Sequence, residues 1–312
     1  MELGHTDIKA AVARVAHRVR PITLAPAGDG AGNLWFALEL LQHTGSFKVR
    51  GALNFLLAHQ ENGTLPAAGV TIASGGNAGL ACAWAARTQG VEATVFLPAT
   101  APEVKVRRLH SYGATVHLVG TQYADALAAS QDFAASTGAL LSHAYDHPFI
   151  AAGAGTLMEE IQQRMPDLDT VVVAVGGGGL FAGIATAADH YGIRTVAVEP
   201  RDCRALHAAV EAGHLVDVPV ESIAADSLGA RRATALALHA AQHYRVDSIL
   251  VDDETIIATR RTLWEDHRLA VEHGAATALA ALHPTAYTPA PHEKVCVILC
   301  GANTNPSDLA TE

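Results

Sequence analysis

The feature that most constrains the fold of this chain is a repeated alternation of short apolar runs with longer helical stretches. Short, nearly continuous apolar runs are typical of strands buried on both faces of a parallel sheet, and the intervening helices cover those faces. We therefore expect an α/β protein with mostly parallel sheets. The predicted strands lie at 34–41, 70–73, 93–97, 115–119, 170–175, 195–199 and 294–299.

The predicted helices separate these strands, and the number of strand–helix units is enough for two lobes. A chain of 312 residues, half of them apolar, can bury two well-packed cores. No long linker interrupts the pattern, so we expect closely connected lobes, each with three layers. The predicted helices lie at 46–60, 78–89, 102–112, 123–136, 151–164 and directly after residues 176–179.

Charge and composition exclude several classes of protein. The net charge is −10 and basic residues do not cluster, which argues against nucleic-acid or anionic-membrane partners. Residues 170–188 carry no charge, but four consecutive glycines interrupt them, so they indicate a strand, a turn and a helix rather than a membrane span. No signal-peptide core opens the chain, and the four cysteines form no C-x-x-C pair. We therefore expect a cytoplasmic protein.

Lysine is rare, and Lys48 occupies an unusual position. It is one of four lysines and lies in HTGSFKVRGALNFLL, where Ser46 is a plausible helix N-cap. A cation in the first helical turn is disfavoured by the helix dipole, and both this placement and burial lower the pKa of an amine. A neutral amine is what a Schiff-base nucleophile requires. Position alone leaves open that Lys48 is an ordinary surface lysine.

Two glycine-containing turns follow predicted strands. Ser74, Gly75, Gly76, Asn77 and Ala78 open a helix, where free backbone N–H groups could bind a substrate carboxylate. An ordinary turn in which Asn77 caps the helix would have the same sequence pattern. The second turn suits a phosphate, held by backbone N–H groups and the helix dipole; it consists of Gly176, Gly177, Gly178 and Gly179.

The second turn also imitates a dinucleotide-binding motif. Gly177, Gly179 and Ala182 satisfy G-x-G-x-x-A, and Glu199 ends the next predicted strand. A nicotinamide-dependent oxidoreductase is therefore a rival interpretation of this segment, although it leaves Lys48 and the first turn unexplained.

Other catalytic motifs are weaker. The last predicted strand ends at Cys300, where ligands of open α/β sheets gather and a thiol could face one. His239 and His243 have helical spacing but lack the glutamate of H-E-x-x-H, so we predict no metal ligands. No G-x-S-x-G elbow supports a serine hydrolase.

Taken together, these features resemble the threonine/serine dehydratases, fold-type II pyridoxal 5'-phosphate (PLP) enzymes related to the tryptophan synthase β subunit. The resemblance runs from about Val15 to Asn303, nearly the whole chain, and its motifs keep the family's order. The matching stretches are LQHTGSFKVRGALN, ASGGNAGLACAWAARTQGVEATVFLP, YDHPFIAAGAGTLMEEI, VVVAVGGGGLFAGI, AADSLGA and VILCGAN.

The resemblance implies a role for each motif. Lys48 would hold the cofactor covalently and later move the substrate's α-proton, with Phe47 beside the cofactor ring. Asn77 would hydrogen-bond the ring hydroxyl, and the four glycines would hold the phosphate. Cys300 would face the pyridine nitrogen, and Gly229 would approach the cofactor edge through its backbone.

The resemblance also implies how the substrate is held. The substrate carboxylate would bind at the first turn, through Ser74, Gly75, Asn77 and the Ala78 amide. Serine replaces Cys300 in other members. A neutral partner there leaves the pyridine nitrogen unprotonated, which suits β-elimination.

Several positions depart from the family's pattern. Gly75 replaces a second serine of the members that racemise serine, so we expect little racemase activity. Ala78 replaces a common histidine, and His273 replaces a usual proline beside Glu272. Ala205 replaces an aspartate of a divalent-metal site, whereas a monovalent cation such as K⁺ near Cys203 stays compatible.

We therefore predict a dehydratase that converts L-threonine and/or L-serine to the 2-oxo acid and ammonia. The expected division is a large PLP-binding domain of residues 1–40 plus 145–312 and a small substrate-closing domain of residues 41–144. A homodimer is expected from the family. The chain ends soon after Asn303, so we expect no C-terminal regulatory domain.

Three alternatives stay open. One is another PLP reaction on this fold: racemisation, β-replacement, or elimination from a bulkier substrate such as phenylserine or 3-hydroxyaspartate. The second is the nicotinamide oxidoreductase. The third is a non-catalytic amino-acid binder, against which Lys48 argues.

Overall fold

The larger of two sheets is built mainly from the second half of the chain. The computed structural model describes residues 3–28, 32–282 and 286–310. Six strands lie in the order β1-β2-β10-β7-β8-β9, and all neighbours are parallel except β1 and β2. Their bounds are β1 Leu24–Pro26, β2 Leu34–Ala37, β7 Thr170–Ala174, β8 Arg194–Pro200, β9 Val246–Val251 and β10 Val295–Ile298.

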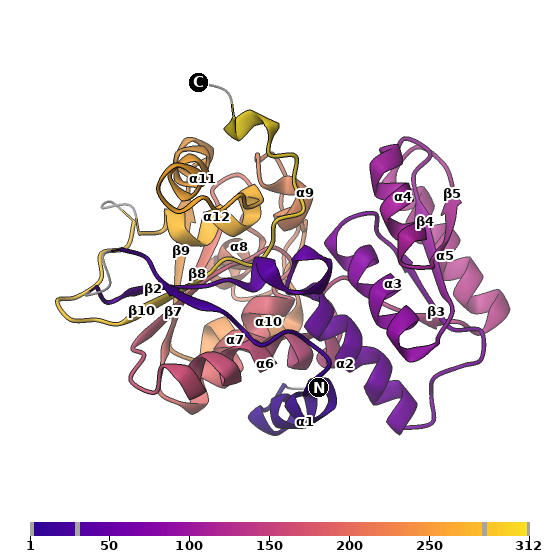
Figure 1. The fold of residues 1–312 in the computed structure, drawn as a ribbon, viewed down its shortest axis with the longest axis horizontal. Helices are drawn as coiled ribbons and strands as arrows, with labels where there is room; N and C mark the ends of the chain where they lie inside the picture. Colours follow the sequence, from indigo (N-terminus) through magenta and orange to yellow (C-terminus); the bar gives the residue numbers. More distant parts are fainter. Residues whose placement is uncertain (1–2, 29–31, 283–285, 311–312) are drawn as a thin grey trace.

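Helices cover both faces of this sheet. In the view of Figure 1, α6, α7 and α10 lie below the strands and α11 and α12 lie above them. The described helices of this part are α1 His5–Val15, α6 Pro148–Arg164, α7 Gly179–His190, α8 Ala205–Ala212, α9 Ala225–Leu228, α10 Ala235–His243, α11 Asp253–His267 and α12 His273–Ala280.

The smaller sheet is entirely parallel, in the order β5-β4-β3-β6. Helices α3 and α5 lie on either side of it, and α2 lies between it and the larger sheet (Figure 1). The bounds are β3 Val70–Ala73, β4 Ala93–Leu97, β5 Thr115–Leu118, β6 Leu140–Leu141, α2 Lys48–Glu61, α3 Asn77–Gln89, α4 Glu103–Ser111 and α5 Tyr123–Thr137.

Each sheet has its own apolar core, as parallel strands covered on both faces require. Val171, Val172 and Val173 of β7 are fully buried in the larger core, and Val95 of β4 is fully buried in the smaller one. The predicted α/β class with mostly parallel sheets is therefore confirmed. Among the described residues, no helix is long and apolar enough to cross a membrane.

A buried ionic cluster joins α2 to the elements of the larger sheet. The Arg50 guanidinium on α2 donates to Glu39 Oε1 at 2.5 Å and to Glu160 Oε1 on α6 at 2.6 Å. Arg50 and Glu39 are fully buried, with 0% and 1% of their surface exposed. A buried charge requires such pairing, so this cluster fixes where α2 sits.

Two local predictions are wrong. The strand predicted at 34–41 ends at Ala37, and Glu39–Leu41 forms a 3₁₀ turn that places the Glu39 carboxylate against Arg50. Ser46 is not the N-cap of α2, because Phe47 occupies that position, and the Ser46 backbone forms a bridge to Gly301. Helix α2 instead begins at Lys48 after Phe47, without a side-chain cap.

Candidate active site

The carboxyl ends of the two sheets face a common cavity of about 520 Å³. Strands β3, β7 and β10 each end there, as ligand sites of open parallel sheets do. The structure brings every predicted site residue to this cavity, including those widely separated in the chain. They are Phe47, Lys48, Ser74, Gly75, Asn77, Ala78, Gly176, Gly177, Gly178, Gly179, Gly229 and Cys300.

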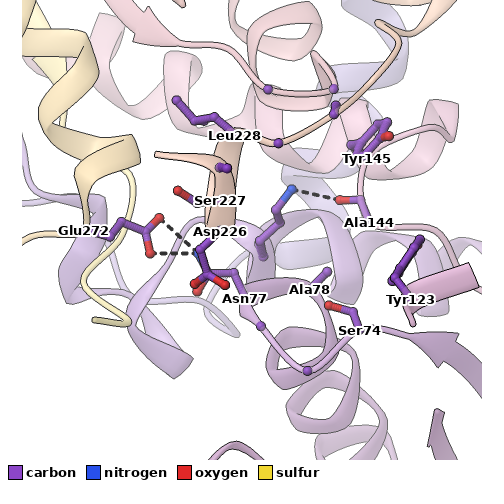
Figure 2. A pocket seen from close by; sticks show the side chains of 18 of the residues that line it. Ser74, Asn77, Ala78, Tyr123, Ala144, Tyr145, Asp226, Ser227, Leu228 and Glu272 are labelled. Carbon is purple, nitrogen blue, oxygen red and sulfur yellow. Dashed lines mark hydrogen bonds between the residues drawn. The ribbon is translucent and has the colours of Figure 1, made fainter. Parts of the chain in front are cut away.

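Lys48 is the first residue of α2 and extends into the cavity. Its Nζ donates to the carbonyl oxygen of Ala144 at 2.9 Å, the contact drawn at Ala144 in Figure 2. Nζ lies 4.7 Å from the Phe47 ring centroid. Burial lowers the pKa of Lys48 to about 8, against the opposing influence of Cys300 and Glu272. The neutral fraction of this amine near physiological pH is therefore far greater than that of an ordinary lysine.

The turn between β7 and α7 has no room for side chains. A Cβ on Gly177 would lie 2.2 Å from the Tyr145 ring, and one on Gly179 would lie 2.6 Å from the Tyr145 carbonyl oxygen. Gly178 adopts the left-handed conformation, with φ of +96°. The backbone is thus exposed to the cavity at the N-terminus of α7, where the first N–H groups have no helical acceptor.

The turn between β3 and α3 is built in a similar way. Helix α3 begins at Asn77 with Gly76 as its N-cap and no side-chain cap bond. A Cβ on Gly79 would lie 1.8 Å from the Ser74 carbonyl oxygen, so glycine is required for the turn to close onto the helix. Ser74 and the first N–H groups of α3 remain available to an anion in the cavity.

Asn77 is held by two partners that are distant in sequence. Its Nδ2 donates to Glu272 Oε1 and Oε2, both at 3.0 Å (Figure 2). Its Oδ1 accepts from Asn303 Nδ2 at 2.5 Å. Burial raises the pKa of Glu272, while the Asn77 hydrogen bond lowers it.

Cys300 and Gly229 line the cavity from the larger sheet. Burial raises the pKa of the Cys300 thiol far above its usual value, so the thiol is neutral. Only 3% of its surface is exposed. The Gly229 N–H donates to the Ala225 carbonyl at 3.0 Å, which leaves its backbone at the end of α9 against the cavity.

Several cavity residues were not predicted from the sequence. Tyr145 is the first residue of the stretch YDHPFIAAG, and Ala144 directly precedes it. This stretch contributed to the resemblance, but neither residue was assigned a role. Tyr123, Asp226 and Ser227 also line the cavity (Figure 2). The motif AADSLGA was the available signal for Asp226 and Ser227, whereas nothing in the local sequence around Tyr123 indicated it.

The geometry does not support the dinucleotide interpretation. Glu199 is 1% exposed, and its two carboxylate oxygens accept from the N–H groups of Leu206 and His207 at 2.8 and 2.7 Å. It caps α8 and does not line the cavity. Within the described part of the chain, no group of three metal-ligating side chains is present.

Comparison with known proteins identifies the class. Residues 15–301 match the family described as pyridoxal-phosphate dependent enzyme. The chain belongs to this family. The fold is that of fold-type II enzymes: two mostly parallel sheets share a cavity that is lined by both the buried lysine and the glycine turn.

Particular relatives refine the comparison. The chain is 35% identical to an L-threonine ammonia-lyase of Geobacter sulfurreducens, over 96% of this chain and 75% of that protein. It is 33% identical to a serine dehydratase-like protein of Rattus norvegicus, over 95% and 93% of the two chains. The structure of maize serine racemase superposes with a TM-score of 0.91 at 29% identity, covering 99% and 96% of the chains.

The residues present fit pyridoxal phosphate. A Cβ on any of the four glycines would collide with neighbouring protein atoms, so the turn presents only backbone to the cavity. This backbone lies at the N-terminus of α7, which suits the phosphate. The partly neutral amine of Lys48 opens into the same cavity. The neutral thiol of Cys300 lines the cavity at the end of β10.

Proposed function

We propose that this protein is a PLP-dependent dehydratase that converts L-threonine and/or L-serine to the corresponding 2-oxo acid and ammonia. The observation that carries the proposal is the amine of Lys48, with a pKa of about 8, in one cavity with the N-termini of α3 and α7, which suit anions. Relatives named threonine ammonia-lyase and serine dehydratase-like support the reaction type.

We assign the cofactor to residues from both sheets. Lys48 would hold it covalently, Phe47 would pack beside its ring, and Asn77 would donate to its ring oxygen. The four glycines would bind its phosphate, with Gly229 at its edge and Cys300 at its pyridine nitrogen. When bound, pyridoxal phosphate supplies the electron sink for loss of the α-proton and the β-hydroxyl.

The chain's own groups would bind the substrate and move its proton. The substrate carboxylate would accept from Ser74 and from the backbone N–H groups at Gly75, Asn77 and Ala78, at the positive end of α3. The Lys48 amine can take up the α-proton because burial keeps its pKa near 8. Elimination removes water, and hydrolysis restores it, so the net products are the 2-oxo acid and ammonia.

Racemisation is the second candidate, since a serine racemase superposes closely on this chain. It requires a proton donor on the face of the α-carbon opposite Lys48. Gly75 has no side chain, and a Cβ there would lie 2.8 Å from Leu97 Cδ2. This position supports elimination as the main reaction.

One experiment tests the proposed function. Purified protein should show a visible absorption band that borohydride removes, and it should form 2-oxo acid from L-threonine or L-serine. Lys48→Ala should lose turnover. A band without product would redirect the search to bulkier 3-hydroxy amino acids or racemisation, and the absence of a band after addition of pyridoxal phosphate would refute the proposal.

We further propose the finer features that the resemblance implies. Residues 41–144 would form a small domain that closes over substrate against residues 1–40 plus 145–312, which would exclude water from the cavity. The protein would be a cytoplasmic homodimer that binds K⁺ near Cys203. Light scattering measures the oligomeric state, and fractionation of cells shows the location. A higher activity in K⁺ than in tetramethylammonium would indicate that the cation binds.

A further inference from the structure

Four polar side chains form a continuous hydrogen-bond chain at the edge of the cavity. Arg108 on α4 donates to Asn303 Oδ1 at 2.6 Å. Asn303 Nδ2 donates to Asn77 Oδ1 at 2.5 Å, and Asn77 Nδ2 donates to both oxygens of Glu272 at 3.0 Å. We call Arg108, Asn303, Asn77 and Glu272 the amide chain. It runs from the smaller sheet's helices to the end of the larger sheet.

The two ends of the amide chain fix the direction of every bond in it. An arginine has only donors, so it must face the oxygen of the Asn303 amide. The nitrogen of Asn303 then faces Asn77, and it also donates to the carbonyl of Thr44 at 2.8 Å. Arg108 itself donates a second bond to that carbonyl, at 3.3 Å. Reversing the Asn303 amide would bring two carbonyl oxygens together.

The other end of the amide chain enforces the same direction. Glu272 is 7% exposed, and its carboxylate lies directly over Gly301, where an added Cβ would be 2.6 Å from Oε1. A carboxylate oxygen accepts from Asn77 Nδ2 whether or not the other oxygen is protonated. The raised pKa of Glu272 therefore does not reverse the bond.

The consequence concerns what Asn77 can offer to the cavity. Its oxygen is occupied by Asn303. One hydrogen of Nδ2 can be shared between the two oxygens of Glu272, so the second hydrogen is left for a ligand. The Asn77 oxygen is turned toward Asn303, so the group that Asn77 offers to the cavity is this N–H donor.

We propose that Arg108, Asn303 and Glu272 are positioning residues that orient the Asn77 amide so that it donates to the ring oxygen of the cofactor. This inference rests on the proposed PLP function and extends it to residues that do not touch the cofactor. A donor stabilises an anionic ring oxygen, whereas the reversed amide would repel it.

Asn303→Asp tests the direction of the chain with little change in shape. An aspartate still accepts from Arg108 but cannot donate to Asn77. The Asn77 amide should therefore reverse, with its nitrogen toward residue 303 and its oxygen toward Glu272 and the cavity. Glu272, whose pKa is raised by burial, can take up a proton and donate to that oxygen. We expect the holoenzyme to bind pyridoxal phosphate about tenfold more weakly or worse. Its visible band should also shift relative to wild type.

Asn305→Asp is the matched control. It makes the same charge change two residues along the same segment, where the side chain only accepts, from the Ser307 N–H at 3.1 Å. It should bind the cofactor like wild type.

Arg108→Glu tests the same inference from an exposed position, should Asn303→Asp fail to fold. A glutamate accepts only, so it should draw the Asn303 nitrogen toward itself and reverse the amides behind it. Arg107→Glu is the control on the same exposed helix. Weaker cofactor binding and a shifted band in Arg108→Glu, but not in Arg107→Glu, would support the proposal.

The proposal is overturned if Asn303→Asp and Arg108→Glu bind the cofactor and absorb as their controls do. If wild-type protein itself binds no pyridoxal phosphate, the proposed function fails instead. The two failures are therefore distinguishable.

Discussion

At the scale of single residues, the chemistry depends on how the protein sets the protonation of Lys48. The position of Lys48 in the first turn of α2 could be predicted from the sequence, and the structure confirms it. The sequence offered two causes of a lowered pKa for this amine, the helix dipole and burial, without ranking them. In the structure the main cause of its lowered pKa is burial, which depends on residues from both sheets.

The lowered pKa of Lys48 predicts how cofactor binding depends on pH. Lys48 must lose its proton before it can bond to the cofactor, so the reactive fraction rises with pH through the folded-state pKa. We expect the rate of pyridoxal phosphate incorporation into apoprotein to rise with a midpoint near 8, rather than near the ordinary value of 10.5. Stopped-flow absorbance measures it. A midpoint near the ordinary value would show that the amine is not buried.

Other residues of the site could not be predicted, because their roles depend on partners far away in the chain. Asn77 and Glu272 are 195 residues apart in sequence, and Asn77 and Asn303 are 226 apart. No local pattern encodes such pairs. The sequence predicted the Asn77 turn but not the groups that orient its amide.

At the scale of elements, the turn between β7 and α7 combines two requirements. Four glycines indicated close backbone approach by a phosphate, but the structure adds that the Tyr145 ring fills the space on the other side of Gly177. Overpacking of such a site typically costs about 1–3 kcal/mol. The turn must therefore leave room for the Tyr145 ring on one side and present its backbone to the cavity on the other.

Gly177→Ala should therefore weaken cofactor binding by about tenfold or more, because its Cβ would collide with the Tyr145 ring. Gly28→Ala is the control, since a Cβ there meets nothing within 4 Å. Fluorescence titration with pyridoxal phosphate measures both. In the double variant Gly177→Ala/Tyr145→Ala, affinity should return to that of Tyr145→Ala alone, and failure to do so would refute the steric explanation.

Gly75, in the turn before α3, leads to a prediction about the type of reaction. Wild-type protein should exchange L- and D-serine very slowly, because Gly75 provides no proton donor. Gly75→Ser alone should add little, since its Cβ would press on Leu97 Cδ2 at 2.8 Å. The double variant Gly75→Ser/Leu97→Ala should exchange the two enantiomers at a measurable rate. Chiral chromatography measures the exchange. Rapid exchange by wild type would contradict the assignment of elimination as the main reaction.

The strand prediction was wrong where contacts made by side chains elsewhere in the chain determine the backbone conformation. Residues 34–41 are continuously apolar except for Glu39, and this pattern favoured a single strand. The burial of the Glu39 carboxylate against Arg50 instead requires a turn after Ala37. Strand β9, at the edge of the larger sheet, was missed because polar residues interrupt it.

At the scale of the whole molecule, the cavity exists only because the two sheets are held in a fixed relation. The alternation of strands and helices predicted two parallel sheets, but not the contacts that join them. The Arg50 cluster is one such contact, since it connects α2 with Glu39 and with Glu160 on α6. Its charges are enclosed between the two cores, where losing one partner leaves another unpaired.

Arg50→Met should consequently destabilise the protein by about 3–5 kcal/mol, because it leaves the Glu39 carboxylate buried without a cation. Arg107→Met is the control: its pair with Glu103 is exposed on α4 and contributes at most about 1 kcal/mol. Urea unfolding followed by tryptophan fluorescence measures both. Glu39 can escape the unpaired charge by taking up a proton, so the loss in Arg50→Met should be smaller in acid than in alkaline solution. Equal losses in the two arginine variants would mean that the buried cluster does not hold α2 against the larger sheet.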